Sequence, residues 1–246
     1  MIKKWLNRVF IDGLSGMAMG LFATLIVGTI ISQIGTIVGG ETGNYLVMMS
    51  SVAKVLTGAG IGVGVAHKYG ESPLVTVSAA SAGMIGAFAS KLLAGEVIVE
   101  GALHLTGAGE PLGAFIAAYV GIELGHLVSG KTKLDILVTP MVTILLGGMV
   151  GLFVGPPISQ FMAQLGAMIQ WGTEQQPFLM GIIVSVLMGM ILTLPISSAA
   201  LGVVLNLSGI AAGAAAVGCS TQMVGFAVAS FKENKFGGLV AQGIGT

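Results

Sequence analysis

Long apolar stretches separated by short polar or charged loops dominate the pattern along the chain. From Gln175 to Phe231 there is no Asp, Glu, Lys or Arg, and Leu, Ile, Val, Met, Gly and Ala fill most of the stretch. A helix needs about 20 apolar residues to cross the hydrocarbon core of a bilayer, so this stretch alone holds at least two crossings. The pattern therefore predicts an all-α integral membrane protein.

The apolar pattern divides into segments of two kinds. We expect membrane spans near residues 14–38, 46–66, 73–93, 112–128, 134–154, 178–194 and 209–231. Segments 95–111, 157–172 and 195–208 are too short or too polar for a plain span, and we expect them to be re-entrant or interfacial. The expected architecture is one transmembrane domain, residues 1–246, built as a multi-span helical bundle with broken or re-entrant helices.

The basic residues in the loops predict an orientation, because Lys and Arg near span ends are retained in the cytoplasm. Such residues precede the first span and follow the second and fourth spans: Lys3, Lys4, Arg8, Lys68, Lys131 and Lys133. These positions agree with a multi-pass protein whose N terminus is cytoplasmic. The side of Lys232 and Lys235 stays open, because it depends on how many segments cross after residue 155.

Composition excludes several classes of protein. Charged residues make up 8% of the chain and the formal net charge is zero, so no basic field indicates binding to nucleic acid. Mean hydropathy is +0.98. The single cysteine, Cys219, excludes an intramolecular disulfide and a cysteine-cluster metal site. The sequence contains neither HExxH nor GxSxG, and we predict no catalytic residues, metal or cofactor on this chain.

The loop from Gly95 to Pro111 is rich in glycine and glutamate. Pro111 suits the first turn of a helix, and Glu110 just before it would lie beside the positive end of that helix. A carboxylate fixed there could accept hydrogen bonds from a polyhydroxylated solute, with His104 as a second ligand. A plain external loop with solvated glutamates is the alternative.

A second polar region lies inside the charge-free stretch. Pro195 removes a backbone donor and breaks a helix, and the freed backbone groups need partners in the protein or in a water-filled cavity. Neutral polar side chains lie near the break and in the last span: Ser197, Ser198, Asn206 and Gln222. They predict either hydrogen bonds between helices or a path for a neutral solute such as a sugar or polyol.

Two further patterns concern packing within the spans. Glu123 and His126 stand at i and i+3 on one helix face, so they can bond to each other, as a structural pair or as a proton relay. Glycines recur in the second span, at Gly58, Gly60, Gly62 and Gly64. They predict close helix packing, with hinges as the alternative.

Several runs of the sequence carry a family resemblance, among them GEPLGAFIAAYVGIELGHLVSGKTKLDILVTP, LPISSAALG and GCSTQMVGFAV. From Val52 onward the chain resembles the EIIC-type membrane proteins that include the perfringolysin O regulator. These proteins are grouped with the membrane subunits of the bacterial sugar phosphotransferase system. The resemblance also implies a location in the bacterial cell membrane and a chain that is truncated at its C-terminal end.

The resemblance implies a homodimeric carrier with re-entrant elements, which holds its solute near the midplane while separate A and B subunits supply the phosphoryl group. Sugar-carrying EIIC proteins hold sugar hydroxyls with a glutamate in a G-x-x-E-P loop, which maps onto Gly107, Glu110 and Pro111. The first hypothesis is therefore a carrier that binds and translocates a small neutral polar solute by alternating access. The alternative is a membrane sensor or regulator that binds a ligand or partner without transport. As an enzyme, the chain would at most be the membrane subunit of a phosphotransferase.

Overall fold

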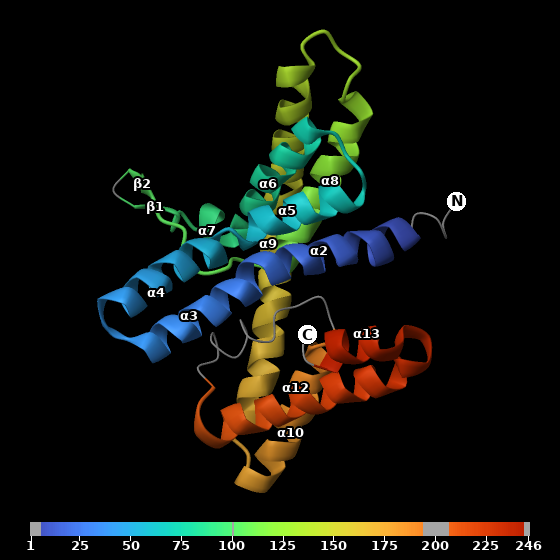
Figure 1. The fold of residues 1–246 in the computed structure, drawn as a ribbon. Helices are drawn as coiled ribbons and strands as arrows, with labels where there is room; N and C mark the ends of the chain where they lie inside the picture. The colour runs from blue at the N-terminus through green and yellow to red at the C-terminus, as the bar shows by residue number, and fades with distance from the viewer. Residues whose placement is uncertain (1–5, 100, 194–206, 244–246) are drawn as a thin grey trace. The chain divides into compact units, whose positions relative to one another are not determined.

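The computed structural model describes residues 6–99, 101–193 and 207–243, and it is almost entirely helical (Figure 1). The chain forms two compact units, Met1–Gln160 and Phe161–Thr246, where the sequence suggested one domain. Ser197, Ser198 and Asn206, and with them the predicted segment 195–208 apart from its last two residues, lie outside the described residues.

The first unit opens with a continuous helix, Arg8–Val38. Its parts are a π-helical turn η1 (Arg8–Gly13), α2 (Leu14–Leu21), a second π-helical turn η2 (Phe22–Ile26) and α3 (Val27–Val38). After it come α4 (Gly40–Val55), α5 (Thr57–Lys68), α6 (Pro73–Ala87), α7 (Ala89–Leu93), strands β1 (Ile98–Val99) and β2 (Ala102–Leu103), and α8 (Pro111–Val128). Helix α9 (Asp135–Thr173) then runs across the boundary between the units.

Glycines let the helices of this unit pack almost backbone to backbone. A Cβ atom on Gly16 of α2 would lie 2.7 Å from the Gly64 carbonyl oxygen of α5, and one on Gly58 would lie 2.7 Å from the Gly83 carbonyl oxygen of α6. Around these crossings the core contains large buried side chains, including Met17, Ile61, Val65, Phe88, Phe115 and Ile122. At these positions, the glycines of the predicted second span act in close packing.

Two predicted spans are interrupted in the structure. The span expected at 46–66 consists of α4 and α5, which meet at Leu56 with a bend of 53°. The segment expected at 73–93 consists of α6 and α7, separated by Phe88, whose backbone departs from helical geometry. Neither break is marked by proline or by a glycine at the break itself. Both therefore depend on tertiary packing, which sequence periodicity does not contain.

Helix α9 joins two segments that the sequence predicts to be separate. We expected a span at 134–154 and a separate short segment at 157–172, divided at Pro156 and Pro157, but Asp135–Thr173 is one helix of 39 residues. Proline removes a backbone donor and favours a kink, yet membrane helices tolerate it when the freed carbonyl groups are satisfied locally. The adjacent Gly155 packs closely on Ala89 of α7, which supports the helix at this point.

The second unit contains the end of α9, α10 (Pro177–Ile191), α12 (Gly209–Ala229) and α13 (Phe231–Gly243). Helices α10 and α12 pack closely where Gly218 meets the backbone of Ser185. The core of this unit is formed by Ile169, Met180, Val184, Met188, Ile191 and Ala215. Helix α13 is kinked at Lys235, whose φ is 52°.

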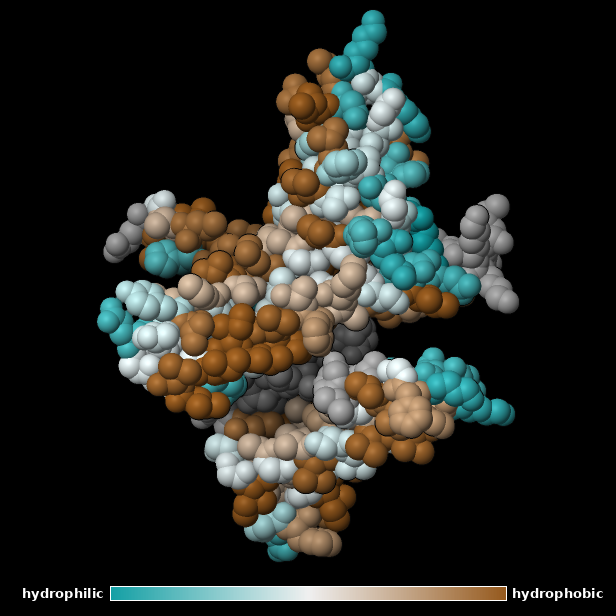
Figure 2. All heavy atoms as spheres, viewed as in Figure 1, coloured by the Kyte–Doolittle hydropathy of each residue, from teal (hydrophilic) through white to brown (hydrophobic). Residues whose placement is uncertain are grey.

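Within the described residues, four helices are long and apolar enough to cross a membrane, and the bent α4–α5 pair can make a fifth. The four are Arg8–Val38, Pro111–Val128, Asp135–Thr173 and Gly209–Ala229, while α6 and α10 are shorter apolar helices. Apolar side chains such as Ile34, Ile37 and Met49 lie exposed on α3 and α4, and brown surface covers this region in Figure 2. The prediction of an all-α membrane protein is confirmed.

Candidate functional site

The loop between α7 and α8 begins as a small exposed hairpin and not as a helix. Strands β1 and β2 pair antiparallel, with Ile98 opposite Leu103 and Val99 opposite Ala102. The amide of His104 then donates to the Val97 carbonyl at 2.7 Å. The His104 side chain is exposed to the surroundings.

After the hairpin the loop returns to the helix break at Phe88. The Glu110 amide donates to the carbonyl of Ala87 at 2.7 Å, and Ala87 is the last residue of α6. Gly109 has φ +68°, and a Cβ there would lie 2.7 Å from the same Ala87 oxygen. Only glycine combines this left-handed conformation with so close an approach. The loop therefore supplies the donor that the end of α6 lacks.

Glu110 is the N-cap residue of α8, with Pro111 in the first helical turn. Its carboxylate accepts a long hydrogen bond of 3.5 Å from the Leu112 amide. Burial raises the pKa of the Glu110 carboxyl above its ordinary value, and the Leu112 N–H opposes that shift. Among the described residues no Lys, Arg or His lies within ion-pair distance of it. Within that part of the chain, Glu110 is thus a largely buried carboxylate without a cationic partner.

Neighbouring polar contacts fix the surroundings of this loop. Ser90 of α7 and Ser159 of α9 share a hydrogen bond of 2.6 Å. The Lys91 ammonium donates to the Thr106 carbonyl at 3.2 Å, and it lies 5.9 Å from the centre of the Phe88 ring. These contacts tie the loop to α7, and α7 to α9, while Glu110 bonds to the end of α6 on the other side of the break.

Gln222 belongs to α12 in the second unit. Its carboxamide oxygen Oε1 is buried and has no hydrogen-bond partner among the described residues. An unsatisfied buried acceptor of this kind costs about 1–3 kcal/mol. The remaining predicted ligands, Ser197, Ser198 and Asn206, are the ones outside the described residues.

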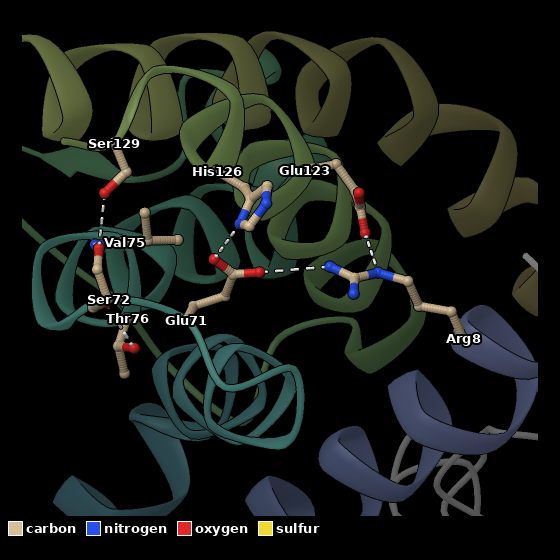
Figure 3. Close-up of polar contacts among 8 residues, drawn as sticks. All are labelled: Arg8, Glu71, Ser72, Val75, Thr76, Glu123, His126 and Ser129. Carbon is tan, nitrogen blue, oxygen red and sulfur yellow. Dashed lines mark hydrogen bonds and ion pairs between the residues drawn. The ribbon is translucent and has the colours of Figure 1, made fainter. Parts of the chain in front are cut away.

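A second polar cluster lies where η1, the α5–α6 turn and the end of α8 meet (Figure 3). Arg8 Nε donates to Glu123 Oε1 at 2.7 Å, and Arg8 Nη2 donates to Glu71 Oε1 at 3.3 Å. His126 Nδ1 donates to the other Glu71 oxygen at 2.8 Å. The Glu71 side chain is only 4% exposed, so this carboxylate is buried between a guanidinium and an imidazole.

Neighbouring contacts reinforce this cluster. The Arg8 guanidinium lies 4.2 Å from the centre of the Tyr69 ring, and the Tyr69 hydroxyl donates to the Arg8 carbonyl at 2.9 Å. Ser72, the N-cap of α6, shares a hydrogen bond of 2.9 Å with Ser129 at the end of α8. In the part of the chain that the structure describes, no three His, Cys, Asp or Glu side chains are placed to hold a metal ion.

This cluster corrects one expectation and adds a residue that sequence analysis missed. Glu123 and His126 do not bond to each other: Glu123 pairs with Arg8, and His126 pairs with Glu71. The two residues do lie on the same helix, but Glu71 from the α5–α6 turn is the partner of His126. The sequence does carry one signal for this pairing. In a membrane protein with few charged residues, the buried ones tend to pair with one another.

The comparisons with known proteins give one match. The family model described as phosphotransferase system, EIIC, matches residues 11–246. No curated protein and no solved structure matches the chain. The family match covers most of the sequence and agrees with the apolar helices. The chain therefore belongs to the EIIC family of the phosphotransferase system, whose members are membrane-embedded transport subunits that work with EIIA and EIIB components.

Proposed function

We propose that this chain binds a small neutral polar solute, such as a sugar, and moves it across the membrane by alternating access. Glu110 is the principal ligand in this proposal and accepts hydrogen bonds from solute hydroxyl groups. Within the family, the runs quoted above favour the group that resembles the perfringolysin O regulator. A separate B subunit would phosphorylate the solute, and two copies of the chain would form the working dimer.

The state of the Glu110 carboxylate is the observation that carries this proposal. It is largely buried, it lacks a cation among the described residues, and its one recorded side-chain hydrogen bond is 3.5 Å long. Hydrogen bonds to charged groups contribute about 1.5–3 kcal/mol each. Two solute hydroxyls would therefore satisfy this carboxylate in a way that the described residues do not.

The other proposed ligands are neutral or exposed. Gln222 would accept a hydrogen bond from a solute hydroxyl at its buried Oε1, which lacks a partner among the described residues. His104 would approach from the hairpin. Ser197, Ser198 and Asn206 would line the path at the Pro195 break. A neutral lining suits a solute without charge, because an ion would need compensating charges at membrane depth.

Ligand-induced thermal stabilisation in detergent tests the role of Glu110. Wild-type protein is heated with each member of a panel of sugars and polyols, and a binding solute raises the melting temperature. We expect Glu110→Gln to weaken binding of that solute about 10-fold or more, since loss of a charge-assisted hydrogen bond costs about 1.5–3 kcal/mol. Gln222→Leu should weaken it less, because the hydrogen bond lost there is a neutral one.

Glu96 provides the matched control, because it lies in the same loop but is exposed. Glu96→Gln removes the same charge and should leave the ligand-induced shift unchanged. Equal shifts for wild type and Glu110→Gln would remove Glu110 from the site.

Uptake into proteoliposomes separates transport from sensing. The carrier predicts that the solute accumulates in vesicles only when the protein is present, and that added EIIB and phosphoryl donor convert it to the phosphorylated form. Binding without uptake would instead support the membrane sensor or regulator.

A further inference from the structure

The Arg8 cluster is a chain of alternating charges built from three separate elements. Its order is His126, Glu71, Arg8 and Glu123, with recorded distances of 2.8, 3.3 and 2.7 Å between neighbours. Each oxygen of the Glu71 carboxylate binds a different group (Figure 3). One is a guanidinium that keeps its charge at all relevant pH values, and the other is an imidazole that does not.

The two groups compete electrostatically for the same buried carboxylate. When His126 is neutral, Arg8 is the only full cation between Glu71 and Glu123, and both carboxylates hold it. When His126 gains a proton, the imidazolium takes part of the negative charge of Glu71 and repels the guanidinium. Protonation therefore weakens the attraction that holds Arg8.

Arg8 begins η1, the part of the first helix that depends most on this cluster. η1 is a π-helical turn (Arg8–Gly13), a geometry that is rare and often located at functional sites. The end of η1 is held by packing, because Gly13 is buried against Tyr69 and Phe115, and Val9 contacts the core. Release of Arg8 would thus free the N-terminal end of η1 while Gly13 and α2 stay in place.

The other charged and titratable groups at this end come from each element packed around His126. Glu123 lies on α8 itself, Glu71 and Tyr69 lie in the α5–α6 turn, and Arg8 and Asp12 lie on η1. The ends of the neighbouring helices add His67, Lys68, Lys131, Lys133 and Asp135. His67 and Lys68 precede Glu71 by a few residues, yet of the three described histidines His126 alone has a recorded bond to the shared carboxylate.

We propose that Glu71 is a proton-controlled latch, at which His126 and Arg8 compete and through which protonation of His126 releases the N-terminal end of η1 at Arg8. On the proposed topology this end faces the cytoplasm, so the latch responds to cytoplasmic acidification. The proposal holds whether the protein transports its solute or only senses it.

A spin-label distance measurement in nanodiscs tests the latch. One label replaces Phe10 on η1 and the other replaces Val77 on α6, which are 60% and 71% exposed, in a Cys219→Ser background. At pH 8 we expect a single narrow distance. At pH 5.5, below the ordinary imidazole pKa of about 6.5, a second population of label-to-label distances should appear. The equilibrium constant for docking of Arg8 should fall about 5-fold or more between pH 8 and pH 5.5, which is the lower end of the coupling found between linked sites.

Three variants make the outcome specific. His126→Gln should keep the narrow distance at both pH values, because its side chain cannot gain a proton. Arg8→Gln should show the second population at both pH values, because the latch has lost its permanent cation. His67→Gln removes a nearby exposed histidine and should respond as wild type does.

Four results would overturn the proposal. They are an unchanged distance in wild type between the two pH values, tighter docking at pH 5.5, a persisting pH response in His126→Gln, and full docking in Arg8→Gln. Loss of the response in His67→Gln is a fifth such result, because it would place the proton sensor at His67 and not at His126. Arg8 and His126 are both partly exposed, so neither variant removes core packing.

Discussion

Glu71 and Glu110 are both buried carboxylates of the first unit, yet their surroundings are opposite. Glu71 has Arg8 on one oxygen and His126 on the other. Among the described residues, the Glu110 carboxylate has a single long hydrogen bond, from a backbone amide. Both lie next to the first turn of a helix, Glu71 just before α6 and Glu110 just before α8. Local position therefore does not explain the difference.

The comparison separates a carboxylate that holds the fold from one that is open to a ligand. A buried charge is tolerated when it is paired and hydrogen-bonded, and Glu71 meets that condition within the protein. Glu110 does not, and the unfavourable burial is reflected in its raised pKa. Substitutions at the two sites should consequently have opposite signatures, one in stability and the other in binding.

The largest expected effect is on stability at Glu71. Glu71→Gln leaves Arg8 with only Glu123 and removes the counter-charge of His126, so we expect the free energy of unfolding to fall by about 3 kcal/mol. Glu110→Gln should change it by less than about 1 kcal/mol, because the amide oxygen can still accept from Leu112. Unfolding by SDS in mixed micelles measures both. Equal losses would erase the distinction between the two carboxylates.

A smaller effect should follow from Gly109→Ala. A left-handed backbone costs a residue with a Cβ about 1–2 kcal/mol, and here the Cβ would also meet the Ala87 carbonyl. Gly107→Ala is the control, since Gly107 has φ +78° and a Cβ added there would have no neighbour within 4 Å among the described residues. We expect Gly109→Ala to lower both the melting temperature and solute binding more than Gly107→Ala does. Equal melting temperatures and equal solute binding in the two variants would show that the loop does not depend on its contact with Ala87.

The smallest effect is the pH dependence that Glu110 gives to stability. Because burial raises the pKa of Glu110 in the folded state above its ordinary value of 4.5, the folded protein holds this proton more tightly than the unfolded chain does. The resulting stabilisation is complete below pH 4.5 and is lost as the pH rises through the folded-state pKa. The melting temperature of wild type relative to Glu110→Gln should therefore fall with rising pH over that interval. A difference in melting temperature that rises or stays constant with pH would contradict this role of Glu110.

Some of this architecture could be predicted because it is encoded locally. Apolar length identified the membrane helices, and the Glu110–Pro111 pair marked the start of α8 through capping and a fixed proline φ. The breaks at Leu56 and Phe88 could not be predicted, because both are set by distant residues: Thr57 beside Leu56 bonds to Thr24 of the first helix, and the returning loop bonds to Ala87 beside Phe88. The Arg8–Glu71 pair joins residues 63 apart in sequence, and no periodic pattern encodes such a contact.

The proposed ligands were predictable to different degrees. Glu110 stood out because an acidic residue before a helix-starting proline has a definite electrostatic environment. The isolation of Glu110 from every described cation depends on where Lys91 points, and only tertiary structure fixes that direction: its ammonium donates to Thr106. Ser197, Ser198 and Asn206 remain predictions.

The hydrogen bond from the Glu110 amide to the Ala87 carbonyl has a consequence for exchange with solvent. Loop amides usually exchange fast, whereas this one is closed by the end of a buried helix and can exchange only when the loop lifts away. The deuterium uptake of this amide therefore reports directly on opening of the loop. A bound solute that holds the loop down would slow that uptake at one backbone position, even if every helix stayed where it is.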